Sequence, residues 1–196
     1  MDDSQDGLFY SSPRFVTHID DDAIATIRRF YGETLPPDGA VLDLMSSWVS
    51  HLPNPNAYPS ITGLGMNGEE LAGNPQLSNW VVQDLNANPV LVMSDETFDG
   101  AVVTVSVQYL TRPIDVFAEV GRVLKPGAPF IVSYSNRCFP TKAVAVWRAL
   151  GDREHADLIG AYFRLSARFE PSSAYDLSPA PGRSDPVFCV VGRRSL

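Results

Sequence analysis

The stretch from Phe98 to Ser135 has a pattern that few folds can accommodate. It begins with FDGAVVTVSV, a continuous apolar run typical of a strand that is buried on both faces of a parallel sheet. The next segment, PIDVFAEVGRVL, has helical spacing, and its expected inner face consists of Ile114, Val116, Phe117, Val120 and Leu124. After the turn KPGA, a second apolar strand follows in PFIVSYS. A strand, a helix and a strand in this order predict a parallel βαβ unit.

The same alternation continues on both sides of this unit. Upstream, the pattern predicts a helix within residues 20–40, a short helix within 67–77, and strands at residues 40–45, 60–66 and 79–84. Downstream, it predicts one helix over residues 140–167, broken near Gly151 and Asp152, and strands within residues 168–177 and 186–194. We therefore expect a single α/β domain over residues 1–196, with a mostly parallel sheet, a final antiparallel strand and helices on both faces.

The composition limits the classes of partner. A formal net charge of −8 argues against a nucleic acid or an anionic membrane, because such partners require clustered lysine and arginine. Cys138 and Cys189 form no C-x-x-C pair, and no histidine pairs with a carboxylate at a metal-ligand spacing, so no metal site is predicted. The N-terminus lacks the basic and apolar regions of a signal peptide, and we expect a cytoplasmic protein with reduced thiols.

Four segments together resemble the class I methyltransferases that depend on S-adenosylmethionine (SAM), in particular small bacterial members of type 11. These segments are VLDL, VVQDL, FDGAVVTVSVQYL and VGRVLKPGAPFIVS. The resemblance implies a Rossmann-like sheet with SAM as the cofactor. Open parallel sheets bind small molecules at the carboxyl ends of their strands, where the loops diverge.

The resemblance also implies which residues bind SAM. Asp43 matches the acid that helps to hold the methionine part of the cofactor. Asp84 matches an acid that accepts a hydrogen bond from the adenine amino group, and Leu85 would pack on the adenine ring. Other cofactor contacts are expected at the same strand ends, from Met45, Ser46, Ser47, Gly65, Met66, Asn67 and Ser106.

The loop after the first strand departs from the family pattern. In the usual motif D-x-G-x-G-x-G, the three glycine positions hold Met45, Ser47 and Val49, so a close approach of the backbone to the ligand cannot be assumed. Ser46 and Ser47 could compensate by donating hydroxyl hydrogen bonds to the cofactor carboxylate. Alternatively, Met45 and Trp48 could fill the pocket.

The end of the second strand departs as well. Gly65 stands where the family usually has an acid that binds the ribose hydroxyls. Asn67 or Glu69 could supply acceptors one turn away, or Gly65 could simply form a turn at the end of the strand.

Residues near the transferred methyl group are expected from the N-terminal segment 1–21, which would fold over the site as a lid, and from the loops after the fourth and fifth strands. We predict catalytic roles for Tyr10, His18 and Gln108, and substrate contacts from Arg14, Tyr109, Asn136 and Arg137. Arg14 could bind an acidic substrate, and His18 could accept a proton. Packing would also explain Tyr109, and proximity to an acidic helix start would also explain His18.

These features predict a SAM-dependent methyltransferase that acts on a small molecule. The alternative is a non-catalytic binding or regulatory protein that kept the sheet and lost the cofactor pocket, and a homodimer is compatible with both. A nicotinamide-dependent reductase would need G-x-G-x-x-G after the first strand and an acid after the second, and both are missing.

Overall fold

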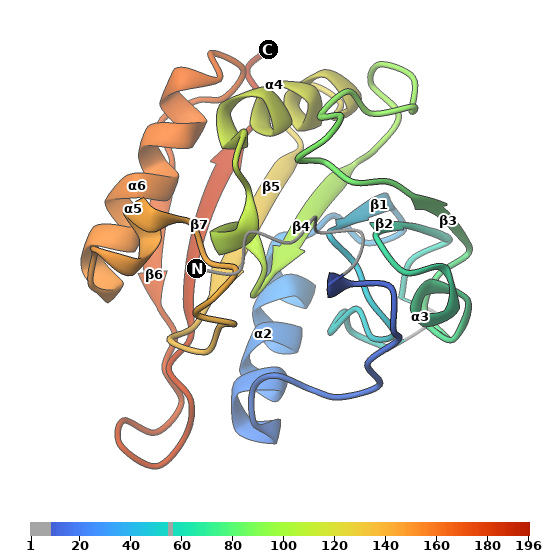
Figure 1. The fold of residues 1–196 in the computed structure, drawn as a ribbon. Coiled ribbons are helices and arrows are strands. Elements are labelled where there is room, and N and C mark those ends of the chain that lie inside the picture. The colour runs from blue at the N-terminus through green and yellow to red at the C-terminus, as the bar shows by residue number, and fades with distance from the viewer. Residues whose placement is uncertain (1–8, 55–56) are drawn as a thin grey trace.

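The computed structural model describes residues 9–54 and 57–196, so residues 1–8 of the predicted lid segment lie outside the described part. The described residues form one seven-stranded sheet in the order β3-β2-β1-β4-β5-β7-β6 (Figure 1). The strands are β1 (Ala40–Leu44), β2 (Ser60–Gly65), β3 (Asn79–Val82), β4 (Gly100–Thr104), β5 (Pro129–Tyr134), β6 (Ser173–Asp176) and β7 (Phe188–Arg193). β1 to β5 pair in parallel, and β7 runs antiparallel to both β5 and β6. The predicted Rossmann-like sheet is therefore confirmed.

Helices cover both faces of this sheet (Figure 1). On one face lies α2 (Asp21–Thr34), whose buried Ile27 and Tyr31 belong to one core cluster with Val102 of β4. On the other face lie α4 (Pro113–Val123) and α6 (Asp152–Leu165), which contribute Phe117 and Phe163 to a second core cluster. Because consecutive β4 residues point to opposite faces, Val102 and Val103 enter different clusters, which explains why the strand must be apolar throughout. The short elements are α3 (Gly68–Ala72), α5 (Ala145–Arg148) and the 3₁₀ helix η1 (Val107–Tyr109).

Two local predictions differ from the structure. Ile114 is 40% exposed rather than buried, because α4 begins at Pro113 and its first turn lies off the buried stripe that starts at Val116. The predicted helix over residues 140–167 begins later, at Ala145, and is interrupted between Arg148 and Asp152. The interruption coincides with the predicted break near Gly151.

Tyr31 connects α2 to the carboxyl ends of the two central strands. Its side chain is fully buried, and its hydroxyl lies 2.8 Å from both Thr104 Oγ1 and Ser133 Oγ. Because Thr104 ends β4, this network holds the edge of the sheet where the parallel strands open.

Replacing Tyr31 with phenylalanine is expected to lower the free energy of unfolding by about 1–3 kcal/mol, because the buried hydroxyl of Ser133 and the half-buried hydroxyl of Thr104 lose a partner. Urea denaturation measures this change. Tyr175→Phe is the matched control, since Tyr175 is 43% exposed and should change stability by less than about 0.5 kcal/mol. Equal stability of both variants would contradict this role of Tyr31.

Candidate functional site

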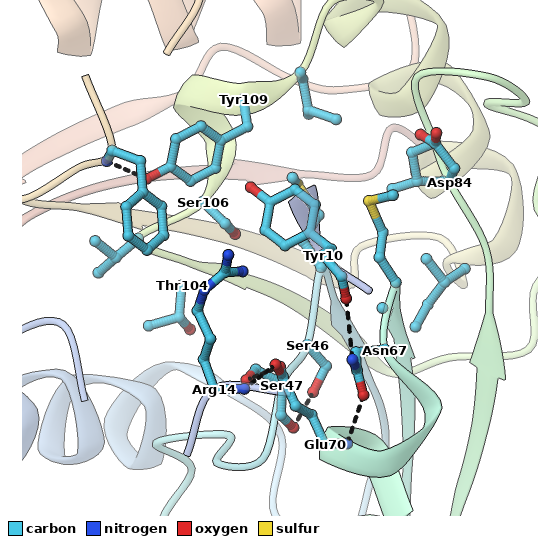
Figure 2. Close-up of a pocket in the computed structure, with 18 of the residues that line it drawn as sticks. Tyr10, Arg14, Ser46, Ser47, Asn67, Glu70, Asp84, Thr104, Ser106 and Tyr109 are labelled. Atoms are coloured by element: carbon cyan, nitrogen blue, oxygen red, sulfur yellow. Dashed lines mark hydrogen bonds between the residues drawn. The ribbon is translucent and has the colours of Figure 1, made fainter. Parts of the chain in front are cut away.

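A cavity of about 310 Å³ lies at the carboxyl ends of the parallel strands (Figure 2). The carboxyl ends of β1 to β4 and the segments after them build most of its wall: residues 45–47, 64–67, 83–86 and 104–106. Residues 137–139 after β5 and side chains of the N-terminal segment complete it. Its volume is in the range of sites that bind small molecules, and its place is the one expected for an open parallel sheet.

The structure brings most of the predicted site residues to this cavity. Those that line it are Tyr10, Arg14, His18, Met45, Ser46, Ser47, Gly65, Met66, Asn67, Asp84, Leu85, Ser106, Tyr109 and Arg137. Asp43, Gln108 and Asn136 do not line it. Glu70 and Gln83 also line the cavity, although the sequence patterns did not predict them. Gln83 directly precedes Asp84, so its place at the end of a strand was a signal in the sequence.

The backbone of the loop after β1 lies close to the backbone of β2, although the loop lacks the glycines of the family motif. Met45 adopts φ 55°, a left-handed conformation that is uncommon outside glycine. The backbone N–H of Ser46 then donates to the carbonyl of Leu64 over 2.7 Å. A Cβ atom on Gly65 would collide with the carbonyl oxygen of Ser46. The glycine that allows the β1 loop to lie against β2 is thus Gly65 of β2 rather than a residue of the loop. The side chain of an acid at position 65 would have no room.

Asp43 lies behind this loop. Its Oδ2 accepts a 2.5 Å hydrogen bond from Ser46 Oγ, and the residue lines a separate cavity of about 60 Å³. Burial raises the pKa of this carboxyl group to about 7, although hydrogen bonds from Ser46 and Ser50 oppose the rise. In this arrangement Asp43 supports Ser46 rather than facing the large cavity.

The loop after β4 contains a strained residue. Val105 adopts φ 48°, and a β-branched side chain in this region costs on the order of 1–3 kcal/mol. Gln108 is buried and donates from Nε2 to the carbonyl of Val105 over 3.0 Å. Gln108 therefore holds the strained backbone in place, and it does so outside the large cavity.

Two buried polar atoms at the cavity have no protein partner among the described residues: Ser106 Oγ and Gln83 Oε1. An unsatisfied buried polar atom costs about 1–3 kcal/mol, so both atoms favour a ligand with polar groups. The amide nitrogen of Gln83 is already used, since it donates to the carbonyls of Asn88 and Val90. The adenine and amino-acid parts of SAM offer partners of this kind, so the cavity fits that cofactor.

Asp84 combines a structural role with its place at the cavity. Its Oδ1 accepts from the backbone N–H groups of Asn86 and Ala87, at 2.8 and 3.3 Å, and so fixes the turn after β3. Leu85, next to it, is almost fully buried.

The N-terminal segment is fastened over the cavity by side chains of the opposite wall. Asn67 Nδ2 donates to the carbonyl of Tyr10 over 3.0 Å, and Trp48 Nε1 donates to the carbonyl of Val16 over 3.0 Å. Trp48 lines only the smaller cavity, so of the two side chains that could fill the cofactor pocket, only Met45 reaches it.

Arg14 and His18 face the cavity from this segment. The Arg14 guanidinium lies over the ring of Phe9, 4.3 Å from its centroid, and donates to the carbonyl of Phe9. Burial lowers the pKa of His18 below its usual value, so the ring is neutral at pH 7. On the far side, Tyr109 Oη accepts from the backbone N–H of Phe139 over 2.8 Å, and burial raises the pKa of Tyr109 to about 12.

Comparison with known proteins shows which family part of this chain resembles. Residues 50–132 match the type 11 family model described as a methyltransferase domain. This match covers 83 of the 196 residues and supports a class I methyltransferase domain in this part of the chain. The matched part begins just after the loop at 45–49, which is where the sequence departs from the family pattern.

Two curated relatives resemble part of this chain. The biotin biosynthesis bifunctional protein BioHC of Teredinibacter turnerae is 30% identical over 79 residues, which are 40% of this chain and 13% of that protein. The methyltransferase phqN of Penicillium fellutanum is 36% identical over 77 residues, which are 36% of this chain and 24% of that protein. The matched part thus spans less than a quarter of each relative.

Solved structures share the fold over nearly the whole chain. A SAM-dependent methyltransferase of Thermotoga maritima has a TM-score of 0.64 at 16% identity, covering 88% of this chain and 90% of its own. The [4+2]-cyclase SpnF has a TM-score of 0.66 at 16% identity, covering 94% and 90%. Because that name describes a different reaction, the shared fold does not by itself decide the chemistry.

Two absences concern the described residues, 9–54 and 57–196. No helix there is long and apolar enough to cross a membrane. The same residues contain no cluster of three or more histidine, cysteine or acidic side chains that could hold a metal ion.

Proposed function

We propose that this chain is a SAM-dependent methyltransferase that acts on a small molecule. The observation that carries the proposal is the cavity at the carboxyl edge of the sheet, where Ser106 Oγ and Gln83 Oε1 are buried without a partner in the described part of the chain. SAM, when bound, supplies an electrophilic methyl group on its sulfonium. The protein's contribution is to orient the cofactor and the acceptor and to exclude water, which can lower a barrier by about 7–11 kcal/mol in favourable cases.

Different segments around the cavity would bind different parts of the cofactor. All five of the residues proposed here line the cavity: Ser46, Ser47, Asp84, Leu85 and Ser106. Asp84 and Leu85 would bind the adenine, and the serines of the β1 and β4 loops would lie near the amino-acid part. The predicted donation from the Ser46 and Ser47 hydroxyls to the cofactor carboxylate does not fit the structure, because these hydroxyls already donate to Asp43 and Glu70. A serine hydroxyl has one proton to donate, so both groups would only accept from the cofactor.

The acceptor would be a small molecule with an anionic group. Arg14 points into the cavity, and its side chain makes no ion pair with a described residue, whereas Arg137 is paired with Asp185 at 2.6 Å. The rings of Phe9, Tyr10 and Phe139 surround the Arg14 guanidinium and hold it in place. A fixed, unpaired guanidinium favours a carboxylate or phosphate on the acceptor.

His18 is the proposed general base. Since burial lowers its pKa, the neutral form persists below pH 6.5, and kcat/KM should stay level as the pH falls through 6.5 and decline only below it. The pH profile, measured with an acceptor found by screening small organic acids, checks this. His18→Gln should lower kcat/KM by roughly 10²-fold or more and remove the decline of kcat/KM at low pH. If the decline is unchanged in this variant, it belongs to another titrating group.

Calorimetric titration with SAM and with its demethylated product, S-adenosylhomocysteine (SAH), tests the proposed function. We expect micromolar binding of both ligands. No heat and no thermal shift at millimolar ligand would instead support the alternative, a binding protein without cofactor.

The same proposal includes a homodimer along β3, the edge strand of the sheet. Trp80 and Val82 of this strand are 46% and 57% exposed, and unpaired edges of this kind favour association. Val82→Lys should convert a dimer into a monomer in light scattering, whereas Val146→Lys on α5 should not, although Val146 is 46% exposed. A wild-type monomer at about 100 μM would rule out this dimer, because stable self-association requires tighter binding.

A further inference from the structure

Glu70 occupies a part of the cavity wall that the sequence pattern did not indicate. It belongs to α3, which Asn67 caps by accepting from the backbone N–H groups of Glu69 and Glu70 at 3.0 and 3.1 Å. This cap orients the helix so that Glu70 lines the cavity (Figure 2). Its neighbour Glu69 is exposed. The two acids therefore belong to the same helix and carry the same charge, but only Glu70 faces the cavity.

The Glu70 carboxylate accepts hydrogen bonds from neutral groups and can accept more. Oε1 accepts from the backbone N–H of Arg14, and Oε2 accepts from Ser47 Oγ, each over 2.7 Å. A carboxylate has about four acceptor positions, so these two bonds leave about half of them. No described cation forms an ion pair with Glu70. A ligand with hydroxyl or ammonium donors would complete this group.

The other positions near the cavity where a carboxylate is expected do not offer a free carboxylate to a ligand at this place. Asp43 lies behind Ser46, and position 65 cannot carry a side chain because Ser46 blocks it. Asn67 uses its side chain for the helix cap and for the N-terminal segment. Asp84 lies across the cavity from Glu70 and fixes the turn after β3 (Figure 2). Glu70 is thus the carboxylate at the junction of the β1 loop, the end of β2 and the N-terminal segment.

We infer that Glu70 binds a hydrogen-bond donor of the cofactor, either the ribose hydroxyls or the ammonium group, and so supplies from α3 the carboxylate that Asp43 and Gly65 do not. The inference rests on the proposed function. Ser47 belongs to the same arrangement, since its hydroxyl holds Glu70 from the position where the family has a glycine.

The experiment compares Glu70→Gln with Glu69→Gln in calorimetric titrations. Each variant loses one charge from the same turn of α3, but only Glu70 lines the cavity. Two probes are used: SAH, and 5′-methylthioadenosine, which keeps the ribose and lacks the amino-acid part. Glu70→Asp is included because it keeps the charge and draws it back by one methylene, and thermal unfolding verifies that every variant is folded.

Glu70→Gln should weaken SAH binding roughly tenfold to a hundredfold, the range expected for a charge-assisted hydrogen bond, and Glu69→Gln should leave it unchanged. An equal loss with 5′-methylthioadenosine would assign Glu70 to the ribose, and a loss with SAH alone would assign it to the ammonium group. If Glu70→Gln does not fold, Glu70→Asp should show a smaller loss in the same pattern. Wild-type binding by the folded Glu70 variants would overturn the inference, whereas failure of the wild-type protein to bind either probe would overturn the proposed function instead.

Discussion

Replacing Gly65 with aspartate, the acid that the family usually has there, is expected to abolish SAH binding rather than to restore a ribose contact. Any Cβ at this position collides with the carbonyl oxygen of Ser46, which is rigid backbone held by the hydrogen bond from Ser46 N to the carbonyl of Leu64. The β1 loop must therefore move, and Ser46 and Ser47 move with it. We expect a loss of affinity above about 10²-fold in calorimetry and a cost of about 1–3 kcal/mol in stability, typical of overpacking.

Gly68→Ala is the matched control for this substitution. A Cβ on Gly68 would lie 3.4 Å from Val82 Cγ2, an ordinary van der Waals contact, and the residue is three positions away, at the start of α3. This variant should bind SAH as the wild type does. Wild-type affinity in the Gly65→Asp protein would show that the β1 loop adapts and that its conformation does not define the site.

Replacing Asp43 with asparagine should stabilise the protein in neutral and alkaline solution. The folded pKa is about 7, above the usual value of 3.8. Below about pH 4 the carboxyl group is protonated in both states. Between pH 4 and 7 the unfolded chain releases the proton while the folded chain keeps it, so the stability of the wild type falls as the pH rises. The asparagine variant lacks this loss and can still accept from Ser46, and its advantage at pH 8 is on the order of 4 kcal/mol as an upper limit.

Denaturation curves from pH 4 to pH 8 measure this difference, with Asp157→Asn on the exposed side of α6 as the control that should not alter it. SAH binding by Asp43→Asn should stay within about threefold of the wild type, because Asp43 does not line the large cavity. A loss above tenfold in the folded variant would show that Asp43 binds the cofactor directly, as the resemblance implies.

Much of the fold could be predicted from the order of apolar patterns. A strand covered on both faces, such as β4, must be apolar at every position, and a helix such as α4 must repeat its apolar side chains at helical spacing, so both are recognisable from local sequence. Ile114 was misjudged because spacing alone does not show where a helix begins on its buried stripe. Since the carboxyl ends of parallel strands share one edge, the segments around Ser46, Gly65 and Asp84 could also be placed together.

The α/β class, the succession of strands and helices and the edge where a ligand would bind can thus be predicted from the sequence, because they follow from periodic burial within short segments. Which side chains reach the cavity depends on the packed fold. Asp43 faces Ser46, Gln108 holds the carbonyl of Val105, and Glu70 meets both Ser47 and the backbone of Arg14. The last of these joins residues 56 positions apart in the chain. Their directions depend on how separate segments pack against one another, and no local pattern records that.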